Sequence, residues 1–483
     1  MEAIRTDVRV DPDKSRVLIR QFFPFPPEQS LHVVARVLSL SEQEVTRQLR
    51  EVLEGFAARH FNIEDVFIRR YERIQGWKFT DQKLSRERSM LLGAYFTSEY
   101  SLECAALFNP SLIPHPDQSG LPEGSTRFIM SLRSVGEGHV SSIQFREGTI
   151  SADHRIEIEK PCQFVTARDP LPTTPYEKEQ FGLKLFDLNL ENDYSQKVMS
   201  RLGSFFTLEE LRRAINEVGE REPKMDGENQ FTRDNMTYLA LSNYEVEFGE
   251  EIPMSARVIF PYSPSETNGI EDPRFVRFKN DDGSFTYYAS YTAYNGRAIF
   301  PQLLQTDDFR RFRIRTMSGR EIRDKDFALF PQKIGGRYVM LSRQDGENIF
   351  IMHSDRVDTW REKAPLVRPT YPWEFIKVGA CGSPILTEEG WLCIDHGVGP
   401  MRRYCIGAFL LDRDDPTKLI GRLEEPLLEP HEQERAGYVP NVVYSCGSMV
   451  HNGVLVLPYA MSDYASRIAL VEMEELLAAL TPQ

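Results

Sequence analysis

The chain has 483 residues, a formal net charge of −14 and an apolar fraction of 41%. Its length allows one large closed architecture with additions, or two to three domains. The negative charge argues against a nucleic-acid or anionic-membrane partner, because both are bound by a surplus of Lys and Arg on one face. No run approaches the roughly 20 apolar residues that span a bilayer, and the first residues lack the basic start and apolar stretch of a signal peptide, so we expect a cytoplasmic protein.

The N-terminal part is expected to be helical. From about residue 28 to 78, apolar residues recur at three- and four-residue spacing among charged ones. Ser41 and Glu44 have the spacing of a capping box, in which each side chain bonds a free amide at the start of a helix. We predict a helical extension over residues 1–90, whose apolar stripe packs either on the main body or on a second subunit of a homo-oligomer.

From about residue 125 onward the pattern changes to short alternating or aromatic runs separated by Gly, Asn and Asp. The clearest of these runs are Phe128–Leu132, Val140–Phe145, Phe285–Tyr294, Tyr338–Ser342, Ile349–His353, Trp391–Asp395, Tyr404–Leu411 and Val454–Tyr459. Many short strands with turn signals between them predict a mainly β fold, either a sandwich, a barrel or a propeller. A propeller would leave only short, protected sheet edges.

Two helical segments interrupt and close this pattern. A polar helical stretch over about residues 172–235 is expected to be an insertion, with Thr207 as a helix cap followed by Glu in the first turn. The apolar spacing after Leu470 predicts a short C-terminal helix over residues 470–483.

The most distinctive segment is Asn268-Gly-Ile-Glu-Asp-Pro-Arg274. Pro273 restricts the preceding Asp272 to extended or turn geometry and removes one backbone donor. The segment is therefore expected to be a stiff turn that holds the Asp272 carboxyl in a fixed orientation, with its charge tuned by Arg274. The alternative is a solvated turn whose carboxylates cap neighbouring amides.

The order and spacing of several segments resemble family 130 of the glycoside hydrolases, the β-mannoside phosphorylases and related β-mannosidases, over about residues 95–475. The segments that carry the resemblance are Leu107-Phe-Asn-Pro-Ser111, Asn268 to Arg274, Tyr291-Thr-Ala-Tyr294, Leu329-Phe-Pro-Gln-Lys333, Lys377-Val-Gly-Ala-Cys-Gly-Ser-Pro384, Glu389 to Val398, Asp412 to Glu429, Val439-Pro-Asn-Val-Val443 and Tyr459 to Asp463. The resemblance implies a five-bladed β-propeller as the catalytic domain, over residues 91–475, with the sugar in its central cavity.

The resemblance also implies roles for individual residues. Asp272 becomes the acid, which passes its proton to the glycosidic oxygen through the mannose 3-hydroxyl. We expect enclosure to raise the pKa of Asp272 and keep it protonated near neutral pH. The positions expected to contact the sugar are Asn109, Ser111, Arg133, Glu271, Arg274, Tyr294, Asp463 and, less directly, Asn441.

Basic residues should separate a phosphorylase from a hydrolase. Phosphate needs no base to activate it, but its charge must be neutralised by several basic groups. Lys377 and His396 resemble family positions that contact phosphate, Lys333 lies near another such position, and Arg315 and Lys325 are looser candidates. Without the resemblance, Lys377 would be taken as a surface lysine and His396 as a core histidine.

The favoured interpretation is an inverting β-mannoside phosphorylase that gives α-mannose 1-phosphate, with a β-mannoside oligosaccharide and inorganic phosphate as substrates. A β-mannosidase on the same fold would need a base to activate water, and Glu374 is the candidate. A non-catalytic sugar-binding propeller is the third interpretation. The six widely spaced cysteines lack Cys-x-x-Cys pairs, so we expect reduced thiols, no metal site and no cofactor.

Overall fold

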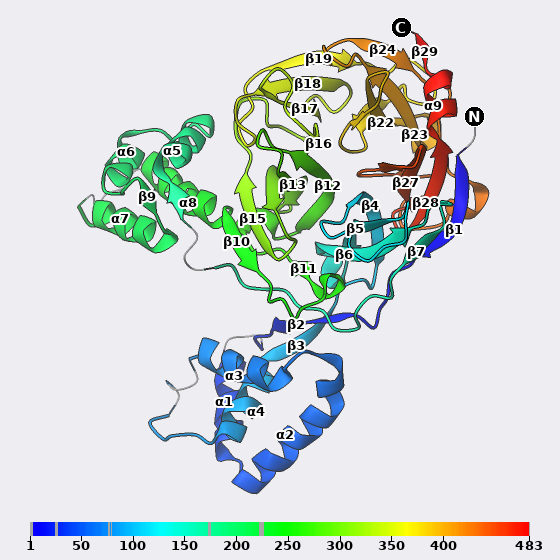
Figure 1. The fold of residues 1–483 in the computed structure, drawn as a ribbon. Coiled ribbons are helices and arrows are strands. Elements are labelled where there is room, and N and C mark those ends of the chain that lie inside the picture. The colour runs from blue at the N-terminus through cyan, green and yellow to red at the C-terminus, as the bar shows by residue number, and fades with distance from the viewer. Residues whose placement is uncertain are drawn as a thin grey trace.

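The computed structural model of the protein describes residues 3–24, 28–75, 78, 80–171, 175–221 and 227–482. Its main body consists of antiparallel sheets, which confirms the expected mainly β architecture. Two helical parts project from this body (Figure 1). Among the described helices, none combines the length and apolar character needed to cross a bilayer.

The first two groups of strands form one continuous sheet. Their members are β4 (Ala106–Pro114), β5 (Thr126–Val135), β6 (Ser141–Ile150) and β7 (Ile156–Ile158), then β10 (Tyr244–Glu247), β11 (Val258–Ile259), β12 (Gly269–Lys279), β13 (Phe285–Tyr294), β14 (Ile299–Thr306) and β15 (Arg311–Thr316). Strands β4 to β7 and strands β12 to β15 pair in succession as antiparallel hairpins, β10 pairs with β15, and β11 pairs with β6. Strands β6 and β12 meet in parallel at Ser141 and Gly269. This parallel contact brings the starts of β6 and β12 together.

The later strands form three further groups around the body (Figure 1). These are β16 (Lys325–Leu329), β17 (Tyr338–Arg343), β18 (Ile349–Ser354) and β19 (Lys363–Val367); β20 (Lys377–Ala380), β21 (Ile385–Leu386), β22 (Trp391–Val398), β23 (Tyr404–Leu411), β24 (Leu419–Arg422) and β29 (Thr481–Pro482); and β25 (Val443–Tyr444), β26 (Met449–His451), β27 (Val454–Met461) and β28 (Ala465–Glu472). Neighbouring groups share apolar cores; for example, Leu392 and Ile406 belong to the same buried cluster as Leu455 and Leu457. Every run predicted from the sequence to be a strand overlaps one of these strands.

The two ends of the chain differ from the prediction. Residues Ile4–Val10 form β1, which pairs antiparallel with β28, so this part of the predicted helical extension belongs to a sheet. At the other end, Leu470 to Glu472 complete β28, and helix α9 covers only Met473–Ala479. Pairing across a sheet overrode the local helical spacing at Leu470. Residues 1, 2 and 483 of the predicted terminal segments lie outside the described residues.

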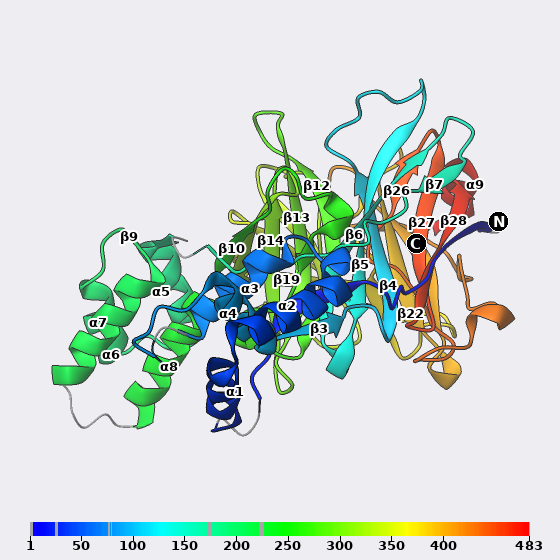
Figure 2. The same cartoon turned by 90° about the horizontal axis from the view of Figure 1, so that it is seen from below.

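The N-terminal helices form a lobe beside the sheets (Figure 2). The lobe contains β2 (Val17–Gln21), α1 (Glu28–Ser39), α2 (Glu42–Phe56), α3 (Ile63–Arg73), α4 (Arg86–Tyr95) and β3 (Thr97–Ser101). The predicted capping box is confirmed: the Ser41 hydroxyl accepts from the Glu44 amide at 3.3 Å, and Glu44 accepts from the Ser41 amide at 2.8 Å. Strands β2 and β3 pair and connect the lobe to the main body.

A second helical part lies to one side of the sheets (Figure 1). It contains β8 (Tyr176–Glu177), α5 (Lys178–Asp187), α6 (Asp193–Ser200), β9 (Phe205–Phe206), α7 (Leu208–Arg221) and α8 (Gly227–Leu241), around its own buried apolar cluster. The predicted cap at Thr207 is confirmed, since its hydroxyl accepts from the Glu210 amide at 3.3 Å. Residues 172–174 and 222–226 of the predicted insertion lie outside the described residues, and α8 extends six residues beyond the predicted end at residue 235.

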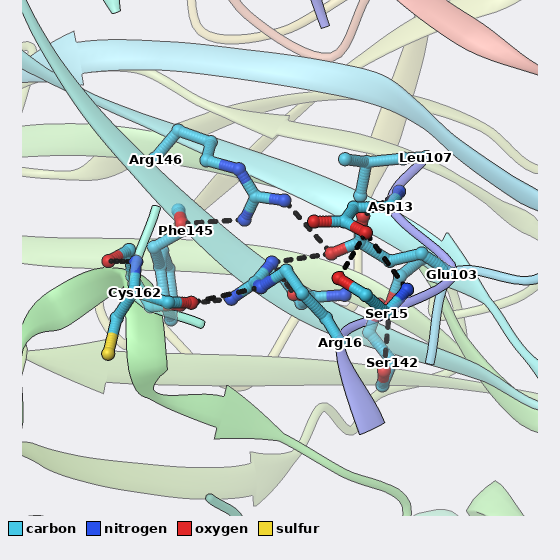
Figure 3. A network of polar contacts seen from close by, with 12 residues as sticks. Asp13, Ser15, Arg16, Glu103, Leu107, Ser142, Phe145, Arg146 and Cys162 are labelled. Atoms are coloured by element: carbon cyan, nitrogen blue, oxygen red, sulfur yellow. Dashed lines mark hydrogen bonds and ion pairs between the residues drawn. The ribbon is translucent and has the colours of Figure 1, made fainter. Parts of the chain in front are cut away.

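A buried ionic network fastens the N-terminal segment between β1 and β2 to the first group of strands (Figure 3). Arg16 donates to Glu103 at 2.5 Å and to Gln144 at 2.6 Å, and Arg146 donates to Glu103 at 2.9 Å. Arg16, Glu103 and Arg146 are almost fully buried. Because an unpaired buried charge costs about 3–5 kcal/mol, the three side chains depend on one another. The network holds the start of the chain against β6.

Candidate active site

Asp272 lies within strand β12 and not in a free turn. The pairing of β12 with β13 shifts register between Glu271 and Arg274, as in a β-bulge, and Asp272 adopts a left-handed backbone with φ of 53°. Such a conformation costs of order 1–3 kcal/mol outside glycine and is found preferentially at functional sites. The bulge re-aims the side chain, which is only 9% exposed.

The same device recurs in two neighbouring inner strands. Asn109 in β4 and Asp326 in β16 have φ of 51° and 66°, and each lies at a register shift. The Asn109 amide donates to the Asp272 carboxylate at 2.6 Å. Bulges in separate strands therefore bring Asn109 and Asp272 into direct contact.

Basic and acidic groups surround the Asp272 carboxyl. Arg133 on β5 lies 3.4 Å from Asp272 Oδ1 and donates to Glu271 at 2.8 Å. Arg274 donates to the Asp272 backbone carbonyl at 3.3 Å. Glu271 and Arg133 thus form an ion pair beside the carboxyl, while Arg274 bonds the backbone of Asp272.

The pKa of Asp272 differs from the sequence expectation. Burial acts to raise this pKa, but Arg133, Lys325 and Arg274 and the bond from Asn109 outweigh burial and hold the pKa below its ordinary value. The expected protonation near neutral pH is therefore wrong for the protein without bound ligand. The sequence predicted correctly that Asp272 is enclosed. It did not predict that Arg133 and Lys325 act on the carboxyl together with Arg274.

Asp463, in the turn between β27 and β28, behaves in the opposite way. Burial and the nearby Asp272 raise the pKa of Asp463 to about 6, against the opposing effect of Arg133 and Arg402. Asp463 also adopts a left-handed backbone, with φ of 52°. A proton is therefore held more readily by Asp463 than by Asp272.

A second ionic cluster lies next to the first and is centred on Asp326. Arg274 donates to Asp326 at 2.6 Å, Arg343 lies 2.9 Å away, and the Tyr444 hydroxyl donates at 3.2 Å. The Asp326 carboxylate has a strongly lowered pKa, because Arg343 and Arg274 outweigh its burial. His396 lies 3.8 Å from Asp326, and burial lowers the pKa of His396 so that the ring is neutral at physiological pH.

Two lysines beside this cluster are not neutralised by a direct partner. Among the described residues, neither Lys325 nor Lys377 forms an ion pair or a side-chain hydrogen bond, and Lys377 Nζ lies 5.4 Å from the centre of the Tyr404 ring. The Lys325 ammonium acts on the pKa of both Asp272 and Asp326, and that of Lys377 acts on His396. Spare positive charge of this kind suits an anionic ligand.

Two predicted phosphate contacts lie elsewhere. Lys333 bonds Asp281 at 2.6 Å, beyond the far end of β12 and roughly 20 Å along the strand from Asp272. Arg315 lies on β15, three strands away from β12 in the same sheet. The register runs from Arg315 through Leu303 and Ser290 to Arg274. About 14 Å of sheet therefore separates Arg315 from β12. The structure does not bring either residue to Asp272.

The remaining predicted sugar contacts lie close to the site in sequence or register. The Ser111 hydroxyl is fully buried and accepts from the Phe275 amide at 3.1 Å, so it joins β4 to β12. Tyr294 ends β13 and pairs with Gly269 at the start of β12, and its side chain is half-buried. Asn441 instead accepts from Arg435 at 2.5 Å.

Glu374, the candidate hydrolytic base, is fully engaged in the structure. Its carboxylate accepts from the amides of Thr370 and Tyr371 at 2.7 and 3.1 Å and from Arg422 at 2.7 Å, and its side chain has no exposed surface. A carboxylate with these partners stabilises a turn, its charge is neutralised by Arg422, and it has no exposed surface from which to activate a water molecule. The structure therefore contradicts the role of Glu374 as a base.

Asp395, beside Glu374, gives a prediction for the pH dependence of stability. Burial raises the pKa of Asp395 to about 7, with Arg422 opposing and Glu374 adding to the effect. Because an unfolded Asp releases its proton near pH 4, the folded protein holds one more proton between pH 4 and 7, and this group makes stability fall as pH rises through that window. Asp395→Asn should remove about 2–3 kcal/mol of the decline between pH 5 and 8. Chemical denaturation at both pH values measures it, and an unchanged decline would contradict the assignment.

Three residues of the site were not found from the sequence. Asp326, Arg343 and Tyr444 come from three different strands and have no local motif of their own. The one available signal was the position of Asp326 just before the Leu329-Phe-Pro-Gln-Lys333 segment. The three side chains come together only when the chain folds and strands β16, β17 and β25 approach one another.

The site combines an enclosed carboxylic acid with a group of buried and partly free cations. Cleavage of a glycosidic bond by an anionic nucleophile needs such a combination, an acid at the leaving oxygen and positive charge for the nucleophile. The protein is therefore of the class of carbohydrate-active enzymes.

Comparisons with known proteins identify the family. A family model described as beta-1,4-mannooligosaccharide phosphorylase matches residues 233–481, just over half of the chain, and the chain belongs to glycoside hydrolase family 130. It is 37% identical over 225 residues to a 1,2-beta-oligomannan phosphorylase of Thermoanaerobacter sp. (strain X514), covering 44% of this chain and 71% of that protein. It is 34% identical over 166 residues to a beta-1,4-mannooligosaccharide phosphorylase of Ruminococcus albus, covering 32% and 50%.

Solved structures of similar proteins also exist. A beta-1,2-mannobiose phosphorylase from Listeria innocua, in complex with beta-1,2-mannobiose, aligns with a TM-score of 0.46 at 20% identity, covering 79% of this chain and 93% of that one.

Proposed function

We propose that the protein is an inverting β-mannoside phosphorylase, which converts a β-mannoside oligosaccharide and inorganic phosphate into α-mannose 1-phosphate and a shortened acceptor. The observation that carries the proposal is the position of Asp272, which is buried at a bulge within the electrostatic reach of Lys325, a cation that forms no ion pair with any residue the structure describes. The names of the similar proteins support the same substrate class. Because those names include both β-1,2 and β-1,4 linkages, the proposal covers β-mannosides without fixing the linkage.

In this proposal a phosphate oxygen forms a bond to C1 of the mannosyl unit while the bond from C1 to the acceptor oxygen breaks. The Asp272 proton passes to the acceptor oxygen through the mannose 3-hydroxyl, leaving Asp272 as the carboxylate. Asn109, Arg133, Glu271, Tyr294 and Asp463 supply hydrogen bonds to sugar hydroxyls. The roles of Arg274 and Ser111 are to hold the bulge and the neighbouring strands around it.

In this proposal, phosphate binding also explains how Asp272 can act as an acid although its pKa is lowered. Lys325 is one of the cations that lower this pKa. A phosphate bound near Lys325, Lys377 and Arg343 compensates part of this positive charge, and the pKa of Asp272 then rises. Asp272 is thus protonated when phosphate, the nucleophile, is bound.

The proposed phosphate site differs from the one expected from the sequence. It keeps Lys377, His396 and the looser candidate Lys325, adds Arg343, and leaves out Lys333 and Arg315. Neutral His396 would serve as a hydrogen-bond donor and not as a charge. Phosphate is the only co-substrate in this scheme.

Several wider features belong to the same proposal. The groups of strands in the described residues suit five propeller blades, with β1 completing the last blade beside β28. We keep the division into an extension over residues 1–90, a catalytic domain over residues 91–475 and a C-terminal helix. Two changes are made: β1 is assigned to the catalytic domain, and the helix starts at Met473. The exposed Leu31 and Phe56 on the N-terminal lobe suit the predicted contact between subunits. The free cysteines suit a reducing compartment such as the cytoplasm.

The proposed reaction is tested by its need for phosphate. Purified protein incubated with β-1,2- and β-1,4-mannooligosaccharides should release α-mannose 1-phosphate, in proportion to added phosphate and without free mannose. In the reverse direction, α-mannose 1-phosphate and a mannoside acceptor should release phosphate. Free mannose formed at an undiminished rate in phosphate-free buffer would establish a hydrolase instead.

A further inference from the structure

Exposed side chains with large apolar surfaces stand on three loops near the active site. His139 lies in the β5–β6 hairpin, Met401 in the β22–β23 hairpin and Tyr438 in the connection between β24 and β25. Met401 is 89% exposed and Tyr438 is 73% exposed. His139 is exposed as well. Single exposed side chains of this kind are common, whereas neighbouring ones can mark a binding surface.

Hydrogen bonds connect Tyr438 to the site. The amide of the next residue, Val439, donates to the carbonyl of Ser462 at 3.1 Å, and Asp463 follows Ser462 directly. The carbonyl of Tyr464 accepts from the Leu107 amide at 2.9 Å, two residues before Asn109. The loop with Tyr438 therefore lies against the turn that carries Asp463.

The other two loops meet the same place. The His139 and Tyr438 rings are 5.9 Å apart at an angle of 36°, and the hairpin with His139 continues from the strand that carries Arg133. The amide of Tyr404, at the base of the hairpin with Met401, donates to the carbonyl of Asn441 at 3.0 Å. Arg402, in the same hairpin, acts electrostatically on Asp463.

The backbone at the tips of both hairpins is strained. His139, Met401 and Arg402 have φ of 59°, 58° and 56° without being glycine. Residues in this region carry a conformational cost that the surrounding structure must hold, and they concentrate at ligand-binding positions.

A flat aromatic face suits a sugar ring. The pyranose of a mannoside has a face of C–H groups that can lie on an aromatic ring, while its hydroxyls bond polar groups at the edge. Here the tilted Tyr438 and His139 rings supply the faces, and Arg402, which acts electrostatically on Asp463, carries hydrogen-bond donors.

We propose that Tyr438 and His139 form a platform for a pyranose ring of the acceptor, one or more units beyond the ring bonded to the transferred mannose. The inference rests on the proposed function and goes beyond it, because it makes the enzyme select oligosaccharides over short acceptors. The occupant is inferred from continuity with the site, because the loop with Tyr438 is hydrogen-bonded to Ser462, directly before Asp463.

The test compares acceptors of different length in the synthetic direction. With α-mannose 1-phosphate as donor, Tyr438→Ala should raise KM for a mannotetraose acceptor about tenfold and leave kcat unchanged, as expected when binding is lost equally in the ground and transition states. KM for a single mannose acceptor should not change. Tyr438→Phe, which keeps the ring, should behave as wild type, and Tyr95→Ala, which removes an exposed tyrosine on the N-terminal lobe, is the matched control.

The outcomes separate the inference from the proposed function. An unchanged KM for the tetrasaccharide in Tyr438→Ala, or an equal rise for mannose, overturns the platform. Absence of transfer by the wild type with any acceptor overturns the proposed function. Calorimetric binding of mannotetraose to wild type and Tyr438→Ala then decides the platform alone, because tenfold weaker binding supports it and equal binding overturns it.

Discussion

Replacing Asp272 with Asn should lower turnover of a mannooligosaccharide by roughly 10²–10⁴-fold while the protein stays folded. Asn can adopt the left-handed backbone found at this position and can still accept the hydrogen bond from Asn109. What it cannot do is donate a carboxylic proton to the leaving oxygen. The variant therefore separates proton transfer from structure.

A reactive leaving group sharpens this test. A mannoside with a nitrophenolate leaving group needs little protonation, so Asp272→Asn should lose much less activity with it than with the oligosaccharide. Asp282→Asn is the control, since Asp282 is an exposed Asp in the turn at the far end of β12, and it should leave both activities unchanged. Near-wild-type turnover of the oligosaccharide by Asp272→Asn would remove this residue from the mechanism.

Several of the long strands and the enclosure of Asp272 could be predicted from the sequence. Runs such as Phe285–Tyr294 and Trp391–Val398 are rich in aromatic and β-branched residues, and this composition predicts strands before any pairing is known. Pro273 marks the bulge because it cannot donate to a regular ladder. The sequence therefore located Asp272 and its stiff backbone, although it suggested a turn where the structure has a bulged strand.

The surroundings of the acid could not be predicted, because they depend on which strand ends meet. Lys333 is close to a family motif in sequence, yet strand direction places it beside Asp281 at the other end of β12. Glu374 is next to the cationic site in sequence, but a turn closes around it and Arg422 neutralises it. The lowered pKa of Asp272 likewise follows from cations on β5, β12 and β16 that only the assembled sheets bring together.

The same reasoning gives a second large effect, on phosphate. Lys377→Ala and Lys325→Ala should each raise KM for phosphate roughly 10–100-fold, since a charge-assisted hydrogen bond contributes about 1.5–3 kcal/mol. Within the described part of the chain neither lysine has an ion-pair partner, so its removal breaks no direct ion pair, and Asp326 keeps its bonds to Arg274 and Arg343. Folding should be unaffected, and initial rates over a range of phosphate concentrations measure the change.

Lys333→Ala is the control that distinguishes the phosphate site inferred from the structure from the site expected from the sequence. The family motif alone assigns Lys333 to phosphate, whereas the structure pairs it with Asp281 at 2.6 Å on the exposed end of the sheet. KM for phosphate should therefore remain at the wild-type value in Lys333→Ala. If this variant lost phosphate affinity while Lys377→Ala kept it, the anion would bind at the opposite end of β12, far from Asp272, and in-line attack on a mannoside protonated by Asp272 would be geometrically excluded.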